Sequence, residues 1–320
     1  MTNPLTEMSG QQIDRLIGAL DSLKDGDLAV DMLIACGERA IPSLELLLLK
    51  GPPRTISLPR CRAARVLGEL GVRSVLLSYF QEYERPLDAA VLFAEDAVRS
   101  AVARELVRWK SDEVFHVLLD AARQRVTAGL VLALGEFHRP ESIPLLVEVL
   151  EDDLCRDEAM ESLRMIPDAA RQYGILAILG FIDVQLEGRS ALVRRRAVLQ
   201  LLAQLGVASG DWEGLRTILW EDDPGTVIAA VQLGFMAAPE SDWPQIAAAL
   251  LRVADKLNWV QEADALQLLD AHPGVAREGA LQIAKHRSES GEHPNWMSPL
   301  WRILRHVLGE ELDNGSTTEP

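Results

Sequence analysis

Apolar residues recur along the chain at the spacing of amphipathic helices. Ile13, Leu16, Ile17 and Leu20 lie at positions i, i+3, i+4 and i+7, which places all four on one face of a helix. The segment 143–150 repeats this spacing with Ile, Leu, Val and Leu. The sequence shows no sustained alternation of polar and apolar residues, the pattern typical of half-buried strands. The pattern therefore predicts an all-α protein.

Short motifs recur at intervals near multiples of about 34 residues, the signature of a repeat architecture. Val66-Leu-Gly-Glu-Leu70 returns 67 residues later as Ala133-Leu-Gly-Glu-Phe137. Looser copies are Ala203-Gln-Leu-Gly206 and Gln232-Leu-Gly234. We expect the glycine after each apolar run to adopt the left-handed conformation that ends many helices.

Proline and acidic residues mark the starts of the predicted helices. Pro42 and Pro144 lie 102 residues apart and open the second helix of a pair, where the missing N–H costs no hydrogen bond. The runs Glu151-Asp152-Asp153 and Glu221-Asp222-Asp223 precede the first helix of the next pair. We interpret these runs as helix caps. Paired carboxylates for acid–base chemistry, or a hard-cation site, are the alternative.

Together these signals predict an α-α superhelix, or solenoid, of about eight helix pairs. The predicted pairs span 28–50, 60–80, 95–121, 123–151, 154–183, 190–220, 224–254 and 257–287. A capping helix is expected within 1–27. The repeat array is expected over 28–287. A linker, a C-terminal helix and a disordered acidic tail are expected within 288–320.

Three segments carry a resemblance to a known family. Cys61–Gly71, Glu95–Arg99 and Ala133–Asp153 resemble HEAT repeats, in particular the short bacterial type known as phycobilisome-lyase HEAT-like repeats. The resemblance implies a right-handed superhelix in which the second helices line a concave face. It also implies that this face holds another protein. A fold of this kind specifies function poorly, because many functions share it.

The charge balance bears on the choice of partner. The chain carries 32 Lys and Arg against 48 Asp and Glu, a net charge of −16. Such a surface repels nucleic acid and attracts a basic protein. Two arginine clusters interrupt the acidic background: Arg189, Arg194, Arg195 and Arg196, and Arg54, Arg60, Arg62, Arg65 and Arg73. We interpret them as partners of acidic turns, with nucleic-acid binding as the alternative.

The sequence contains no motif of a known catalytic or nucleotide-binding site, such as HExxH, GxSxG or GxxxxGK[ST]. Cys36, Cys61 and Cys155 are widely spaced, which argues against a disulfide framework or a structural zinc site. The segment 285–294 gathers two His and two Glu. We interpret it as a polar linker, with a metal site as the alternative. We therefore expect no catalytic residue, no cofactor and no metal.

The tryptophans provide the candidate contact residues. Six of the seven lie beyond residue 200. Trp212, Arg216 and Trp220 follow at i, i+4 and i+8, so a regular helix would place them on one stripe. Trp and Arg are the residues richest in binding energy at protein interfaces. The predicted partner-binding residues are Trp212, Arg216, Trp220 and Trp243; the alternative is that these rings fill gaps between repeats.

The expected function is that of a non-catalytic protein–protein interaction scaffold or adaptor, which binds a basic protein partner with the concave face of the solenoid. An accessory subunit of a bilin-lyase-type modifying enzyme is an alternative that the family resemblance implies, and nucleic-acid binding is another. The longest apolar stretches, 126–135 and 174–182, are shorter than the roughly 18–20 residues of a membrane span. A cytoplasmic protein without a membrane partner is therefore expected.

Overall fold

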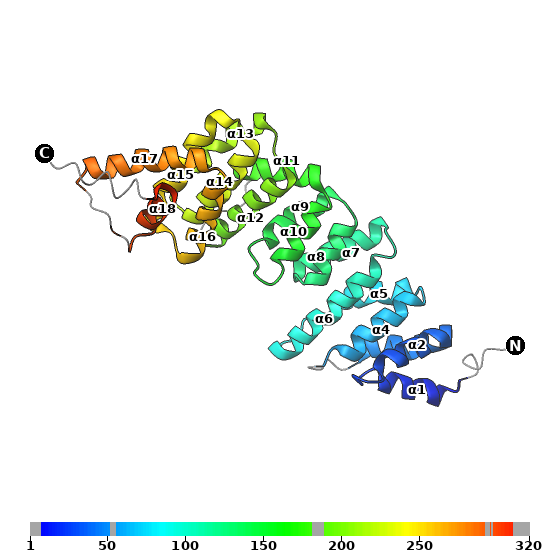
Figure 1. The fold of residues 1–320 in the computed structure, drawn as a ribbon. Helices are drawn as coiled ribbons and strands as arrows, with labels where there is room; N and C mark the ends of the chain where they lie inside the picture. The colour runs from blue at the N-terminus through cyan, green and yellow to red at the C-terminus, as the bar shows by residue number, and fades with distance from the viewer. Residues whose placement is uncertain (1–7, 52–55, 181–188, 292–294, 296, 310–320) are drawn as a thin grey trace. The chain divides into compact units, whose positions relative to one another are not determined.

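A computed structural model describes residues 8–51, 56–180, 189–291, 295 and 297–309. Within these ranges every regular element is a helix and none is a strand (Figure 1). The prediction of an all-α protein is confirmed. The chain divides into two compact units, Met1–Ile166 and Pro167–Pro320.

The helices of the N-terminal unit follow one another in pairs joined by short turns. They are α1 (Gly10–Ala19), α2 (Gly26–Cys36), η2 (Gly37–Ala40), α3 (Ile41–Glu45), η3 (Leu46–Lys50), α4 (Leu58–Glu69), α5 (Arg73–Gln81), α6 (Ala89–Leu106), α7 (Asp112–Gln124), α8 (Ala128–Glu136), η4 (Pro140–Ser142), α9 (Ile143–Val149) and α10 (Arg156–Arg164). The first helices of successive pairs contact each other: α2 with α4, α4 with α6, α6 with α8 and α8 with α10. Val66, Val98 and Leu130 on these helices are buried in one hydrophobic core.

The C-terminal unit continues the alternation of helices. Its elements are α11 (Pro167–Ile178), α12 (Arg189–Leu205), α13 (Ser209–Leu215), η5 (Arg216–Trp220), α14 (Pro224–Ala237), η6 (Glu240–Asp242), α15 (Trp243–Arg252), η7 (Ala254–Lys256), α16 (Trp259–Asp270), α17 (Pro273–Glu289) and α18 (Pro299–Leu308). Here α14 contacts both α12 and α16, and α15 contacts α17. The last helix, α18, packs against α16 and α17.

The helices lie where the repeats predict them. α1 lies within the range 1–27 and α18 within 288–320, where single helices were expected; the capping role stays a prediction. The predicted pair 224–254 contains α14 and α15. Residues 310–320, predicted as a disordered tail, lie outside the described residues.

Several helix starts also match the prediction. Pro42, Pro144 and Pro244 each stand in the first turn of a second helix. Asp223 caps α14, and its carboxylate accepts a hydrogen bond of 2.7 Å from the Thr226 amide. Asp152 instead accepts from the Leu154 amide within the preceding turn, at 2.8 Å. The acidic runs therefore satisfy backbone N–H groups, as capping predicts.

The recurring Leu-Gly motif has a different role from the one predicted. Gly68 and Gly135 do not end their helices but lie buried inside α4 and α8. The left-handed residue comes three positions later, at Gly71 (φ 76°) and His138 (φ 53°). Only Gly206 of the recurring motifs has a positive φ, of 75°. In the loose copy Ala203–Gly206 the glycine therefore corresponds to Gly71 and His138, and not to Gly68 and Gly135.

The buried glycines allow neighbouring first helices to approach closely. A Cβ atom on Gly135 would lie 2.7 Å from Cα of Ser162 in α10. A Cβ atom on Gly129 would lie 2.4 Å from Cα of Ser100 in α6. Real Cβ contacts are longer, so these positions exclude any larger residue without movement of the backbone.

Arginines tie one helix pair to the next. Arg62 on α4 donates to the carbonyl oxygens of Leu20 (2.8 Å) and Ser22 (2.7 Å), beyond the end of α1. Arg252 on α15 donates to the Glu221 carbonyl oxygen at 2.6 Å. Other arginines form ion pairs with carboxylates elsewhere in the chain: Arg60–Glu95, Arg73–Glu113, Arg125–Asp96, Arg195–Glu221, Arg196–Asp223 and Arg287–Asp255. Most described members of the arginine clusters thus bind acceptors within the protein; Arg54 and the side chain of Arg189 lie outside the described residues.

Candidate functional site

The structure does not place the four predicted contact residues on one surface stripe. Trp212 is only 2% exposed, and it is among the largest fully enclosed side chains of the core. Its Nε1 donates to the Asp242 carboxylate at 3.3 Å. Trp212 is therefore a core residue, and the prediction of a contact role for it is wrong.

A change of helix type separates Trp220 from Trp212. The segment is α-helical over α13 and 3₁₀-helical over η5, so each residue from Arg216 onward turns the chain by about 120° instead of about 100°. Over eight residues a regular α-helix would leave Trp212 and Trp220 about 80° apart, whereas the observed mixture separates them by about 160°. Trp220 consequently points away from the core and is 61% exposed.

The other predicted residues lie in separate environments. Arg216 is exposed. The Trp220 ring lies under the Arg252 guanidinium, 5.8 Å from its carbon. Trp243 is half-buried, with its ring edge-on to His272 at 4.7 Å. Trp220 and Trp243 remain candidates for partner contact, but they do not form a single site with Trp212.

A groove in the C-terminal unit crosses three successive first helices. Its volume is about 480 Å³, within the range of ligand sites. Residues of α12, α14 and α16 line it, and α14 packs against both of the other helices; Figure 1 shows these three helices next to one another. Its lining residues are Arg196, Gln200, Gly225, Ile228, Ala229, Gln232, Gln261, Asp264, Gln267, Leu268 and Ala271. We call it the glutamine groove.

Three of the glutamines come from three different helices, and Gln232 shares a helix position with each of the other two. Gln200 and Gln232 each lie five residues before the last residue of α12 and of α14. Gln232 and Gln267 each lie nine residues after the cap residue of α14 and of α16. All three side chains are exposed and make no hydrogen bond within the described residues. The groove therefore presents one free amide from each helix.

The charged residues at the groove differ in their availability. Arg196 forms two bonds to the Asp223 carboxylate, of 2.9 and 2.5 Å, and lies over Gly225. Burial raises the pKa of Asp223, but the bonds from Arg196 and Thr226 outweigh it, so the pKa lies below its usual value. Asp264 is exposed and has no ion pair among the described residues. The one uncompensated charge at the groove is therefore negative.

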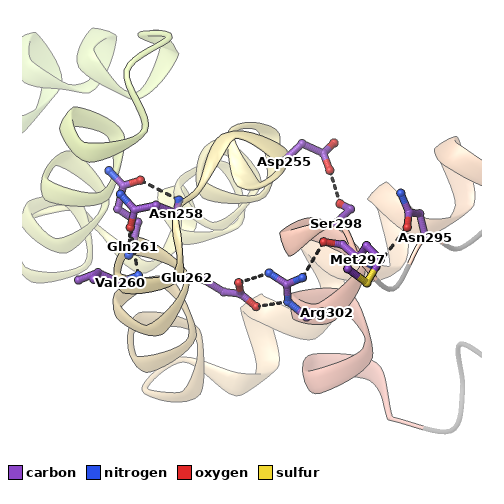
Figure 2. A network of polar contacts seen from close by, with 9 residues as sticks. All are labelled: Asp255, Asn258, Val260, Gln261, Glu262, Asn295, Met297, Ser298 and Arg302. Carbon is purple, nitrogen blue, oxygen red and sulfur yellow. Dashed lines mark hydrogen bonds and ion pairs between the residues drawn. The ribbon is translucent and has the colours of Figure 1, made fainter.

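The fourth glutamine is part of a helix cap. The Gln261 side-chain oxygen accepts a hydrogen bond from the backbone amide of Asn258 at 3.1 Å. The backbone amide of Gln261 donates in turn to the Asn258 side-chain oxygen at 3.0 Å. Figure 2 shows this capping box beside Glu262, which binds Arg302 of α18 through both of its oxygens. These contacts fix the first turn of α16, and with it the side of the groove that α16 forms, to α18.

The N-terminal unit contains a second cavity, of about 530 Å³. Its inner wall carries a buried network in which the Glu95 carboxylate accepts from Tyr79 and from Arg60. Burial raises the pKa of Tyr79 far above its usual value. At the rim Lys50 pairs with Glu82 at 2.8 Å. The lining also contains the Tyr83 hydroxyl, which is buried without a hydrogen-bond partner in the described residues, and the carboxylate of Glu84.

Behind that network, Arg99 uses only part of its hydrogen-bonding capacity, since its Nε and Nη1 are buried with no hydrogen-bond partner in the described residues. Arg99 is fully buried, donates to the Ala121 carbonyl oxygen at 2.8 Å, and lies 4.1 Å from the centre of the Tyr83 ring. Burial lowers the pKa of Arg99. Its contacts join α6 to α7 and to the end of α5, which is a structural role.

Metal-ligating and nucleophilic groups are not concentrated in the described part of the chain. No cluster of three or more His, Cys, Asp or Glu side chains suited to a metal ion occurs there. The segment 285–294, weighed above as a metal site, lies partly outside it. The three cysteines are free, and burial raises the pKa of Cys155 to about 11, which disfavours the reactive thiolate. No helix within the described ranges combines the length and apolarity needed to cross a bilayer.

The chain matches no protein-family model, no curated protein and no solved structure. The glutamine groove was also missed from the sequence alone. The signal available was the position of Gln200 and Gln232, each five residues before the end of its helix.

Proposed function

We propose that the protein is a non-catalytic scaffold or adaptor that binds a basic protein partner. The observation that supports this function is the glutamine groove, which offers three free amides and an unpaired carboxylate across three helices. Such groups suit hydrogen bonding to another polypeptide. The groove lies on first helices, whereas the family resemblance pointed to second helices.

We further propose that the helix pairs stack as a HEAT-like solenoid. The contacts between successive first helices and the recurring glycine motif support this arrangement. A globular protein of 320 residues has a radius of gyration of about 20 Å. Small-angle X-ray scattering is expected to give a clearly larger value, and a value near 20 Å would contradict the solenoid.

The charge distribution supports a basic protein over nucleic acid. The net charge is −16, and Arg60, Arg62, Arg195 and Arg196 bind carboxylates or carbonyl oxygens inside the protein. Their positive charge is therefore largely neutralised where it stands. The cytoplasm is the proposed location, since free cysteines suit a reducing compartment.

Affinity capture from a lysate of the source cells tests the function. The bound material is treated with nuclease, washed at about 0.1 M and then about 0.5 M salt, and identified by mass spectrometry. We expect a discrete basic protein that survives nuclease and is released by salt. The purified pair should then bind with an affinity that falls as salt rises.

A different result would redirect the interpretation. Loss of all bound material on nuclease treatment would favour the arginine clusters and contradict the proposal. Binding that is insensitive to salt would contradict the electrostatic part of it. A substrate turned over by the purified protein would contradict the non-catalytic part.

A further inference from the structure

We infer that the glutamine groove binds an extended polypeptide segment that carries a Lys or Arg side chain. This inference rests on the proposed function and names the site and the form of the partner. It depends on the spacing of the groove's amides, the chemistry of its lining and the sign of its free charge.

The spacing of the helices that carry the three amides fits an extended chain. Packed helices lie about 8–10 Å apart, and α14 packs against both α12 and α16. Three residues of polyproline II helix extend about 9.3 Å. Because Gln200, Gln232 and Gln267 come one from each of these helices, side chains about three residues apart on an extended segment would pass one helix after another. A segment of about nine residues spans all three helices.

The lining supplies what an extended backbone lacks. A chain outside a helix or sheet has unpaired N–H and C=O groups, and a primary amide offers both a donor and an acceptor to match them. The free side chains of Gln200, Gln232 and Gln267 provide such amides. Between them, Ala229 of α14 is small, which lets a backbone approach closely, whereas Gly225 is covered by the Arg196 guanidinium.

The charge of the groove selects a basic side chain. Arg196 is neutralised by Asp223, so Asp264 is the lining group whose charge has no partner in the described residues. A Lys or Arg on the bound segment would compensate it. A helical ligand is less suitable, because its backbone groups are already paired and would leave the three amides unsatisfied.

Peptide selection with a matched control tests the inference. A phage-displayed library of random peptides, each of about nine to twelve residues to span three helices, is selected on the full chain. It is counter-selected on the triple variant Gln200→Ala, Gln232→Ala, Gln267→Ala. The control variant carries Gln81→Ala, Gln124→Ala and Gln245→Ala, which also removes three exposed amides but none from the groove. Circular dichroism checks that both variants remain folded.

The expected peptides contain Lys or Arg and lack an amphipathic helical pattern. By fluorescence anisotropy, a labelled copy should bind the triple variant with a dissociation constant at least about tenfold higher than for the full chain. The control variant should bind it normally. Asp264→Asn should weaken the Lys-containing peptide but not a copy in which norleucine replaces that Lys.

Three results would overturn the inference: no enrichment over the triple variant, enriched peptides of helical pattern, or equal affinity for the triple and control variants. The outcome is separable from that of the proposed function. A basic partner from the lysate that binds the triple variant as well as the full chain would reject the groove and leave the proposed function standing. Peptide binding at the groove, with no protein partner captured from the lysate, would support the groove and contradict the proposed function.

Discussion

The ring of Trp212 occupies the space that a side chain at residue 234 would need. A Cβ atom built on Gly234 would lie 2.8 Å from Cη2 of Trp212 and 2.9 Å from Cδ1 of Ile246. Gly234 lies inside α14, and Trp212 comes from α13. The glycine of the Leu-Gly motif at 232–234 and the buried Trp212 ring therefore pack directly against each other.

Gly234→Ala should destabilise the protein by about 1–3 kcal/mol, because the added methyl group forces Trp212 or Ile246 to move. Denaturant unfolding measures this. Combining it with Trp212→Phe should recover part of the loss, since the smaller ring leaves room. Gly210→Ala is the control: a Cβ there meets nothing within 4 Å, so the helix should be unchanged or slightly stabilised. Equal effects of the two alanines would reject the packing explanation.

The same pair shows how far the sequence could predict the structure. Apolar spacing and recurring motifs depend on local geometry, which is why the helices of the pair 224–254 lie where they were expected. The role of Gly234 depends on a ring from another helix, and no local pattern reveals that contact. His138 illustrates the same limit, since it takes a left-handed conformation while its Nδ1 lies 2.7 Å from the Met165 carbonyl oxygen.

The candidate site was less predictable than the fold. The expected stripe of Trp212, Arg216 and Trp220 assumed a regular α-helix, and the switch to a 3₁₀-helix at Arg216 rotated Trp220 away from it. Sequence patterns report helix type poorly, because α and 3₁₀ turns accept similar residues. The equivalence of Gln200 and Gln232, in contrast, is visible in the sequence once the helix ends are known.

Trp212→Ala and Trp220→Ala should separate the core from the surface. Removing the enclosed Trp212 ring is expected to lower the free energy of unfolding by about 3–5 kcal/mol. Removing Trp220, which is exposed and contacts Arg252, should cost at most about 1 kcal/mol. Thermal and denaturant unfolding provide both values. A large loss from Trp220→Ala would mean that its ring is buried in solution.

Glu95→Ala should be strongly destabilising, by about 3–5 kcal/mol, because it leaves the guanidinium of Arg60 buried without its carboxylate. It also removes the acceptor of the Tyr79 hydroxyl. The control is Glu82→Ala, which breaks the exposed pair with Lys50 and should change stability little. Denaturant unfolding of both variants tests the contrast, and similar losses would show that the Glu95 network is solvated.

Asp223 should make the stability of the C-terminal unit depend on pH. Its pKa lies below the usual value in the folded state, so its contribution is present above the unfolded pKa of about 4 and is lost as the pH falls through the folded pKa. The stability difference between the natural protein and Asp223→Asn should therefore be largest at neutral pH, about 1–2 kcal/mol, and shrink below about pH 4.

Glu221 provides the opposite case two residues away. Burial raises its pKa, so its ionisation opposes folding, and this cost appears as the pH rises from about 4 through the folded pKa. Relative to Glu221→Gln, the natural protein should lose stability over that interval. Urea unfolding of both variants at several pH values measures the two trends. The stability difference between the natural protein and each variant is plotted against pH. If it changed in the same direction for Asp223→Asn and Glu221→Gln, the opposite pKa shifts assigned to Asp223 and Glu221 would be wrong.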